Sequence, residues 1–326
     1  MKLTVAVIAY GRYKYLDEAV ASIARQTRPP DEVIVFTDNK GAVKPFFEKY
    51  GVQAEIFHEP ELTLPATYAR IGEIASGHYI LPLEDDDVFK PEKLEVVEQI
   101  LKERRYPLVK HATDFIDVWT KPTTWIQQPE EPVVMTRENA WQLYSRFPYH
   151  VWPSTFAIKI ELLKKYGEVL KRLLLHADFA IYVLALRDGG VLYRPEKLTY
   201  YRVGSGHSQL TTCSDLPKLV CTWNKYTYDD KLLLSYMGDD SLLAKIVLST
   251  YIYHAIRIYL FNKSHMCNYK YDITYRDLLL STFEAWRLGA SSLKRRVLLT
   301  LGVMSIPILG KSVISRLYIE CRGRSM

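Results

Sequence analysis

Strand-like and helix-like patterns alternate through the first 90 residues, and this alternation limits the folds that the chain can adopt. Short apolar, β-rich runs are separated by segments whose apolar residues recur at helical spacing. We expect strands over Leu3–Ala9, Asp31–Asn39, Val52–His58 and His78–Glu84, and a helix over Thr67–Gly77. Strands that alternate with helices favour a parallel, doubly wound α/β sheet, in which ligands bind beyond the carboxyl ends of the strands.

Three polar segments follow these expected strands and are therefore candidates for a binding site. They are Ala9–Arg12, Thr37–Asn39 and the four acids Glu84–Asp87. The first loop contains neither GxGxxG nor GxxxxGK(S/T), so it has no dinucleotide-binding fingerprint and no P-loop. A nucleotide bound at this edge must be held in another way.

The four consecutive acids Glu84–Asp87 end the last of these strands. Like charges repel one another and resist leaving water, so we expect a basic side chain or a metal ion beside them. Strand alternation would point Glu84 and Asp86 to one side and the other two acids to the opposite side. The alternative is an exposed acidic turn that caps the helix starting near Pro91, because acids favour helix N-termini.

Longer stretches of the chain resemble the family 2 glycosyltransferases, which have the GT-A fold. The opening of that family is matched by VAVIAYGRYKYLDEAVASIARQTRPPDEVIVFTDN. Its Gly-Glu-Tyr strand, DxD segment and Pro-x-x-Leu helix start are matched by ASGHYILPLEDDDVFKPEKL. Its Glu-Asp helix, Gly turn and Arg-x-His-x-x-Ser strand end are matched by HADFAIYVLALRDGGVLYRPEKLTYYRVGSGHSQ. The motifs occur in order over roughly residues 1–210.

This resemblance implies an α/β GT-A fold, a Rossmann-like, mostly parallel mixed sheet flanked by helices. Residues 1–212 would form the nucleotide-sugar-binding and catalytic domain. Residues 213–326 read as a mostly helical C-terminal region that associates with a membrane.

The resemblance also implies a divalent metal ion, Mn²⁺ or Mg²⁺, at the acid run. Such ions prefer oxygen ligands and neutralise the negative charge that develops on a leaving diphosphate. We expect Asp86 to contact the metal, assisted by Asp87 or Asp85, while Glu84 holds the ribose or a metal-bound water. His207 is a further candidate for the metal or the diphosphate, with a solvated loop histidine as its alternative.

Further residues are assigned to the donor nucleotide by the same resemblance. Asp38 would accept a hydrogen bond from the ring N–H of the base, which suits uracil, or else form an Asx turn. Ala9 and Tyr10 would lie beside the base, although Tyr10 is equally suited to packing, and Arg12 is placed with these donor-binding residues. Two more arginines would reach the diphosphate or pair with neighbouring acids: Arg70 and Arg202.

Inverting transfer needs a general base that deprotonates the acceptor hydroxyl. Asp178 matches the second acid of the family's Glu-Asp pair and is the candidate; the alternative is a helix N-terminal acid stabilised by the helix dipole. Trp152 would stack on an acceptor sugar or fill core.

The resemblance, together with these residues, implies a metal-dependent, inverting glycosyltransferase that moves a sugar from a nucleotide sugar, most readily a UDP-sugar, to a glycan or lipid-linked acceptor. Two departures from the family pattern keep a rival open: Glu84 replaces the first Asp of DxD, and Ala177 replaces the first acid of the Glu-Asp pair. The rival is a non-catalytic sugar- or nucleotide-binding or assembly protein with the same fold. A membrane-anchoring structural role is the third alternative.

The basic charge of the chain is concentrated at its end. The net charge is +6, yet the segment Ala285–Met326 alone carries eight Lys and Arg against one Glu. The remainder is therefore near neutral, and a nucleic-acid-binding surface is not expected. Within Leu293–Tyr318 an apolar stretch of about 14 residues falls short of the roughly 20 that a bilayer span needs. An in-plane amphipathic segment on a membrane is expected, with a packed helical appendage as the alternative.

No signal peptide precedes the first expected strand, and the four cysteines are far apart. The cysteine spacing therefore favours neither a zinc site nor a disulfide framework. We expect a cytoplasmic protein that is peripheral to the cytosolic membrane face.

Overall fold

A nine-stranded mixed sheet forms the centre of the molecule in the computed structural model, which describes residues 1–116, 128–144, 151–203, 216–238, 240–261, 272–290 and 293–310. The strand order is β3-β2-β1-β4-β8-β6-β9-β5, and β7 pairs with β9 beside this path. The strands are β1 (Leu3–Ala9), β2 (Glu32–Thr37), β3 (Glu55–His58), β4 (Tyr79–Glu84), β5 (Val88–Phe89), β6 (Leu108–Ile116), β7 (Val133–Met135), β8 (Phe156–Lys159) and β9 (Val191–Arg202).

Helices connect the strands and then form the C-terminal part of the chain. Those of the sheet region are α1 (Leu16–Ala24), α2 (Lys40–Lys49), α3 (Leu64–Ile74), α4 (Lys93–Glu103), α5 (Ala140–Tyr144), the 3₁₀ turn η1 (Pro153–Thr155), α6 (Ile160–Arg172) and α7 (Ala177–Arg187). Those that follow are α8 (Leu216–Met237), α9 (Ser241–Phe261), α10 (Tyr275–Leu288) and α11 (Leu293–Leu309).

The first four strands confirm the expected parallel arrangement. Strand β1 pairs in parallel with β2 and β4, and β2 pairs in parallel with β3. The sheet becomes mixed where β8 inserts antiparallel between β4 and β6. Helix α3 begins at Leu64, three residues before the expected start. The reason is local: the Thr63 hydroxyl accepts a hydrogen bond from the Ala66 N–H, and Pro65 suits the first helical turn.

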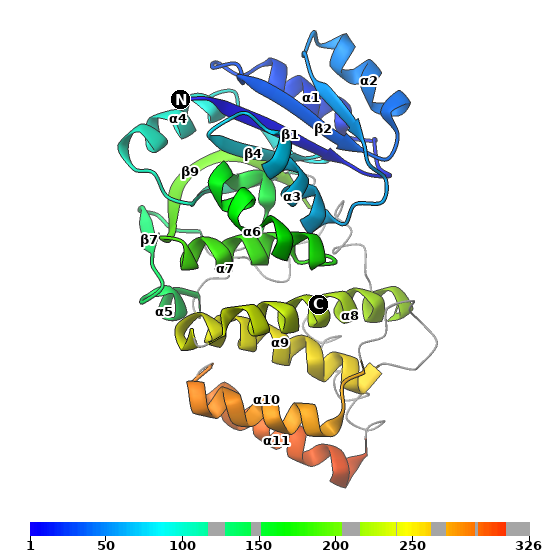
Figure 1. The fold of residues 1–326 in the computed structure, drawn as a ribbon, viewed down its shortest axis with the longest axis vertical. Helices are drawn as coiled ribbons and strands as arrows, with labels where there is room; N and C mark the ends of the chain where they lie inside the picture. The colour runs from blue at the N-terminus through cyan, green and yellow to red at the C-terminus, as the bar shows by residue number, and fades with distance from the viewer. Residues whose placement is uncertain are drawn as a thin grey trace.

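The two faces of the sheet are covered by different helices (Figure 1). Alternate residues of β1, such as Val5 and Val7, pack with α1, α2 and α4. The residues between them, such as Ala6 and Ile8, pack with α3, α6 and α7. Both faces of the central strands are thus buried, which is why their sequences are nearly continuous apolar runs.

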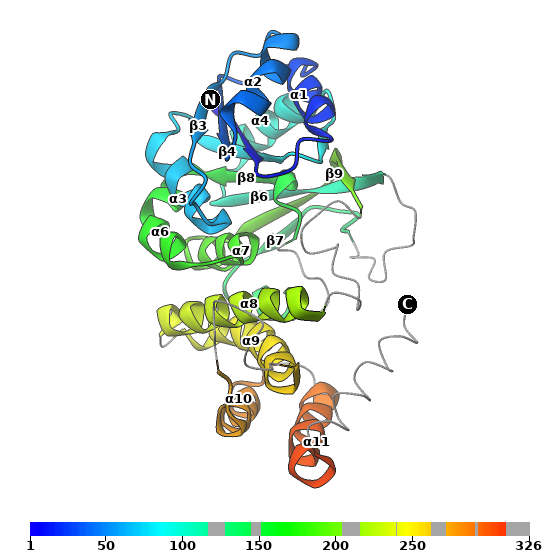
Figure 2. The same cartoon turned by 90° about the vertical axis from the view of Figure 1, so that its right-hand side faces the viewer.

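The C-terminal helices extend this second layer away from the sheet (Figures 1 and 2). Residues of α8 and α9, including Met237 and Val247, belong to the same apolar core as α7. A separate apolar cluster joins α8 and α9 to α10 and α11. Among the described residues, no helix is long and apolar enough to cross a membrane. Cys221 on α8 is disulfide-bonded, against the sequence expectation.

Candidate active site

The three polar segments singled out in the sequence lie at one edge of the sheet. Because β1, β2 and β4 are neighbouring parallel strands, their carboxyl ends meet there. Ile8 of β1 is paired with Glu84 of β4, and Ala9 is paired with Thr37 of β2. The loop after β1, Asp38 and the acid run therefore share one edge.

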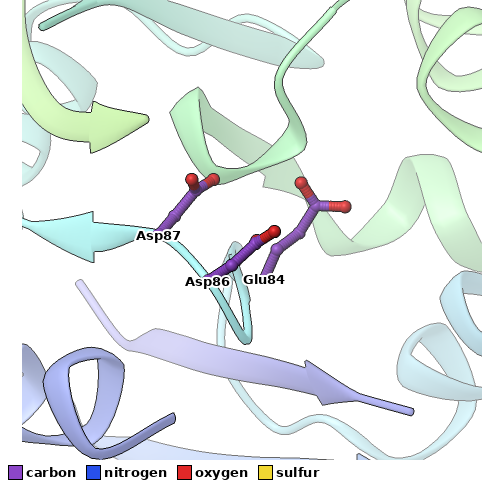
Figure 3. A group of neighbouring side chains, drawn as sticks. All are labelled: Glu84, Asp86 and Asp87. Atoms are coloured by element: carbon purple, nitrogen blue, oxygen red, sulfur yellow. The ribbon is translucent and has the colours of Figure 1, made fainter. Parts of the chain in front are cut away.

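The acid run is a turn rather than a continuing strand. Glu84 is the last residue of β4, and the Asp87 N–H donates to the Glu84 carbonyl at 3.2 Å. The expected strand alternation is therefore wrong for Asp87, because the turn returns its carboxyl to the side of Glu84 and Asp86. One oxygen from each of these three side chains lies within 4.8 Å of the other two. Figure 3 shows the three carboxyl groups projecting from this single loop.

The acids carry strongly perturbed proton affinities. Burial, followed by repulsion from Asp86, Asp87 and Asp85, holds the pKa of Glu84 well above its usual range. Burial raises the pKa of Asp85 to about 7, although Arg12 acts against this rise. Burial and the charge of Asp86 likewise raise the pKa of Asp87 to about 7. The site thus gathers more negative charge than its protein surroundings compensate.

Two arginines supply part of the positive charge that was expected beside the four acids. Arg12 donates from Nη2 to Asp85 Oδ1 at 2.8 Å and from Nη1 to Asp86 Oδ2 at 3.2 Å. Arg202 is buried; its N–H donates to Asp87 Oδ1 at 3.0 Å and its Nε to the Asp86 carbonyl at 2.9 Å. Its Nη2 pairs with Glu18 at 2.7 Å. Arg202 thus braces the acid turn from within the fold.

The Glu84, Asp86 and Asp87 cluster fits a hard divalent cation. Its donors are all carboxylate oxygens, which Mg²⁺ and Mn²⁺ prefer. Asp87 is fully buried, and its Oδ2 has no hydrogen-bond partner among the described residues. A buried acceptor without a partner is costly, and a cation at this point would satisfy it.

Asp38 lies just beyond β2 and is joined to the loop after β1. Its Oδ1 accepts hydrogen bonds from the Gly11 N–H at 3.0 Å and from the Tyr13 hydroxyl. Burial opposes ionisation, but these hydrogen bonds outweigh it and lower the pKa of Asp38. Gly11 has φ +67°, a left-handed conformation that glycine adopts without strain. Asp38 is therefore held as a carboxylate at the sheet edge.

The residues predicted around the base have protein contacts of their own. Ala9 ends β1 and is fully buried. The Tyr10 hydroxyl lies 3.3 Å from Thr67 Oγ1 and 3.4 Å from the Glu59 carbonyl, which ties β1 to α3. Arg70 on α3 also binds Glu59, through Nε at 3.0 Å.

Arg70 makes a second ion pair, with Glu73 at 3.0 Å. Pairing with neighbouring acids was one of its two sequence interpretations. His207 lies outside the described residues.

Asp178 stands in the first turn of α7. The Phe179 N–H donates to its Oδ1 at 2.8 Å. Burial raises the pKa of Asp178, while His176 and Lys110 act in the opposite direction. The charge of Asp178 also contributes to the raised pKa of Glu84, so the two carboxyl groups interact electrostatically. The result is a carboxyl group with a raised proton affinity, which suits a general base.

Trp152 lies immediately before η1 in a strained backbone conformation. Its φ of 67° is the only positive value among the described non-glycine residues. Its ring contacts Phe115 and Tyr201, with centroid distances of 5.2 Å and 5.5 Å. The indole is only partly buried, so it combines packing with an accessible surface.

Two buried lysines hold this segment, and neither was predicted from the sequence. Lys110 Nζ donates to the Val151 carbonyl at 2.6 Å and to Thr155 Oγ1 at 2.7 Å. Lys93 Nζ donates to the Ser154 carbonyl and to Thr199 Oγ1. Burial lowers the pKa of both lysines well below the usual range. The available signal was Lys110 itself, a charged residue inside an apolar strand pattern.

Comparisons with known proteins agree with this architecture. The family model described as glycosyl transferase family 2 matches residues 4–167. The uncharacterized glycosyltransferase alr2836 of Nostoc sp. is 24% identical over 238 residues, which cover 66% of this chain and 68% of that protein. Glycosyltransferase GlyG of Streptococcus pneumoniae is 29% identical over 107 residues, covering 31% of this chain and 36% of GlyG.

Solved structures are similar over nearly the whole chain. The crystal structure of S. aureus TarS 1-349 has a TM-score of 0.66 at 15% identity and covers 98% of this chain and 92% of that one. The same TarS chain in complex with UDP-GlcNAc has a TM-score of 0.59 with the same coverage. The shared fold therefore includes the C-terminal helices.

Proposed function

This chain belongs to glycosyl transferase family 2, and on that premise we propose that it moves a sugar from a UDP-sugar to a hydroxyl of a glycan or lipid-linked acceptor, with a divalent cation and inversion of configuration. The proposal rests on one observation, the cluster of Glu84, Asp86 and Asp87 oxygens at the carboxyl edge of the sheet, whose charges interact with that of Asp178. In this proposal the acid cluster would receive the diphosphate and Asp178 the acceptor hydroxyl. The UDP and UDP-GlcNAc complexes of TarS support a uridine donor.

The base of the donor would lie against the end of β1. Asp38 remains ionised because its hydrogen bonds lower its pKa, so it can accept a hydrogen bond from a ring N–H. Uracil offers such a donor at its N3. Ala9 and Tyr10 would border the base, with Tyr10 kept in place by Thr67.

The diphosphate would lie beside the acid turn. Asp86 and Asp87 would hold the cation, and Glu84 would hold the ribose or a metal-bound water. When bound, Mg²⁺ or Mn²⁺ neutralises charge on the departing diphosphate. Arg12 already spans Asp85 and Asp86, so its positive charge lies where the phosphates would arrive. For Arg70 and Arg202 the contact with the diphosphate stays a prediction, since both also serve ion pairs within the protein.

Asp178 would act on the acceptor. Its raised pKa lets the carboxylate take the proton of an acceptor hydroxyl as that oxygen attacks the anomeric carbon. The partly exposed Trp152 ring would lie under the acceptor sugar, and the buried Lys110 would fix the segment that carries it. Catalysis would then combine positioning with proton removal.

Calorimetric titration with UDP and GDP, with and without Mn²⁺, tests the donor site. Wild type is compared with Asp86→Ala and with the matched control Asp188→Ala, whose carboxyl pairs with Lys165 at the far end of α7. We expect metal-dependent UDP binding that Asp86→Ala abolishes and Asp188→Ala retains. If folded wild-type protein binds neither nucleotide, the donor site is wrong and the non-catalytic assembly role becomes the better explanation.

We also propose that α10 and α11 lie on an anionic membrane surface. Most exposed large apolar side chains of the described residues are on these two helices: Leu279, Leu280, Phe283, Trp286, Val297, Leu298, Leu301, Met304, Ile308 and Leu309. Exposed basic residues, including Arg276, Arg287 and Lys294, accompany them. Apolar insertion together with basic charge is the pattern of an interfacial helix pair.

Vesicle flotation tests this surface. We expect binding to vesicles that contain phosphatidylglycerol, weaker binding to pure phosphatidylcholine, and loss of binding in Leu301→Asp. The matched control is Tyr228→Asp, which places the same charge at an exposed aromatic position on α8. Equal binding by Leu301→Asp and wild type would refute the proposed surface.

A further inference from the structure

Two adjacent acids in the middle of α8, Asp229 and Asp230, are completely buried. They belong to the C-terminal helical region, not to the sheet that carries the other acids. Asp229 accepts three backbone hydrogen bonds at 2.8 Å, from the N–H groups of Leu174, Leu175 and His176. These three residues directly precede α7, and Asp178 follows in its first turn.

Asp229 holds the loop before α7 from a different helix, through three backbone N–H groups that precede α7. The residue at the N-cap position of α7, His176, makes no side-chain capping hydrogen bond. The first N–H groups of a helix have no partner within it, and they attract negative charge. The Asp229 carboxylate binds the N–H of the N-cap residue His176 and brings negative charge to the end of α7 where Asp178 lies.

Asp230 binds the side chain of the same loop. Its Oδ1 lies 3.0 Å from His176 Nδ1, and its Oδ2 lies 2.8 Å from His254 Nδ1 on α9. The His176 ring is stacked on Phe179 at 4.7 Å and lies 4.5 Å from the Tyr226 ring. The imidazole therefore has one defined orientation between Asp230 and the start of α7.

The charges of this network reach Asp178. Burial acts to lower the pKa of His176, but Asp230, Asp178 and Asp229 together raise it. Burial raises the pKa of Asp178, and the largest effect that opposes this rise comes from His176. The His176 ring is thus bound to Asp230 and interacts electrostatically with the proposed base.

Other titratable groups surround Asp178 and His176 from every element packed there. They are Tyr226, Asp229 and Asp230 on α8, His254 on α9, Lys110 on β6, Glu84 on β4, Tyr68 on α3, Tyr144 on α5 and Tyr201 on β9.

We propose that Asp229 and Asp230 are positioning residues for the transfer reaction: α8 fixes the loop before α7 and, through His176, sets the orientation and charge environment of Asp178. The inference rests on the proposed role of Asp178 as the base. It gives the C-terminal helices a part in catalysis that a separate membrane-binding appendage would not have.

The test compares Asp230→Asn and Asp229→Asn with wild type in the full-length chain. Asparagine keeps the size and one acceptor oxygen but removes the charge. Without Asp230, burial favours neutral His176, and Asp178 loses the positive neighbour that lowers its pKa. A base with a higher pKa is deprotonated only at higher pH, so the acidic limb of the pH–rate profile should move upward by about one pH unit.

Release of UDP from UDP-glucose and UDP-N-acetylglucosamine is followed from pH 5 to 9, beside calorimetric UDP binding with Mn²⁺. We expect kcat to fall at least tenfold in both variants, with KM for the donor and UDP affinity unchanged. The matched control is Asp277→Asn, which alters the capping carboxylate of α10 in the same helical region. It should keep the wild-type rate and pH profile.

The outcomes separate this inference from the proposed function. Wild-type rates and pH profiles in both α8 variants would overturn the positioning role. A wild-type rate in Asp178→Asn would overturn the base assignment itself, and with it both proposals. If either α8 variant loses UDP binding, NMR titration of the His176 ring in wild type decides: a pKa at or below the ordinary histidine value would refute the network.

Discussion

Replacing Asp87 with asparagine isolates the electrostatic cost of the acid turn. The side chain is fully buried, and the new amide keeps an oxygen that can accept from the Arg202 N–H. The change removes one charge and replaces the partnerless Oδ2 with a neutral group. We therefore expect Asp87→Asn to make the metal-free protein more stable, which is unusual for a substitution in a buried site.

The magnitude follows from the pKa of Asp87, which rises from 3.8 to about 7. The folded state holds this proton more tightly than the unfolded chain, so stability falls as pH rises between these two values. At about 1.4 kcal/mol per pKa unit, the ionised side chain costs roughly 4 kcal/mol above pH 7. The acids titrate together and share that cost, so about 2 kcal/mol is expected from this substitution, or roughly 4 °C in Tm.

Thermal unfolding at pH 5 and pH 8, with and without excess Mn²⁺, measures the effect. In wild type, Mn²⁺ at about 100 times its Kd should add about 2.7 kcal/mol. In Asp87→Asn we expect a higher metal-free Tm at pH 8, a smaller gain at pH 5 and little response to Mn²⁺.

The matched control is Asp85→Asn, a second buried acid with a pKa of about 7 that lies outside the metal cluster. It loses its ion pair with Arg12 but should keep the Mn²⁺ response. A lower Tm of Asp87→Asn at pH 8, or full stabilisation of this variant by Mn²⁺, would contradict the proposed cost of the buried charge.

Three further substitutions probe the site. Asp178→Asn should lower kcat by about 10²–10⁴-fold while UDP binding, measured by calorimetry, stays unchanged. Trp152→Ala should raise KM for the acceptor alone. Because the residue has φ 67°, the free energy of unfolding of Trp152→Gly should exceed that of Trp152→Ala by about 1 kcal/mol. Asp38→Ala should weaken UDP binding by about tenfold without changing the affinity for free Mn²⁺.

The sequence predicted the sheet well because its signals there are local. Continuous apolar runs such as Leu3–Ala9 arise where a strand is covered on both faces, and β1 has those bounds. The order of strands and helices then implied parallel pairing, and β1, β2 and β4 pair in parallel. The family assignment depends on motifs within the same stretch, and the family comparison confirms it.

Partners that are distant in sequence could not be predicted in the same way. Arg12 is 74 residues from Asp86, and no spacing rule joins a loop after β1 to a turn after β4. The turn that brings Asp87 to Glu84 is also a tertiary effect, because Arg202 holds its carboxyl from a strand more than a hundred residues away. The roles assigned to Asp86, Asp178 and Trp152 stay predictions for the experiments above.

Contacts between distant parts of the chain also bear on the domain boundary that the sequence predicted after residue 212. Helix α7 is buried on nearly every side, as expected of a helix between two layers rather than on a surface. One of those layers is α8 and α9, whose Leu233 and Val247 share its apolar core. A fragment of residues 1–212 would expose that face and lose the hydrogen bonds of Asp229 to the loop before α7.

We therefore expect residues 1–212 to show no cooperative unfolding and no UDP binding, whereas a fragment that ends after α9, at Phe261, should show both. Differential scanning calorimetry and UDP titration compare the two fragments directly. Cooperative unfolding with wild-type UDP affinity in the shorter fragment would mean that the catalytic domain is complete without α8. In that case the buried acids of α8 would serve only the C-terminal helices, and the layer of α8 and α9 would be an addition to the site rather than part of it.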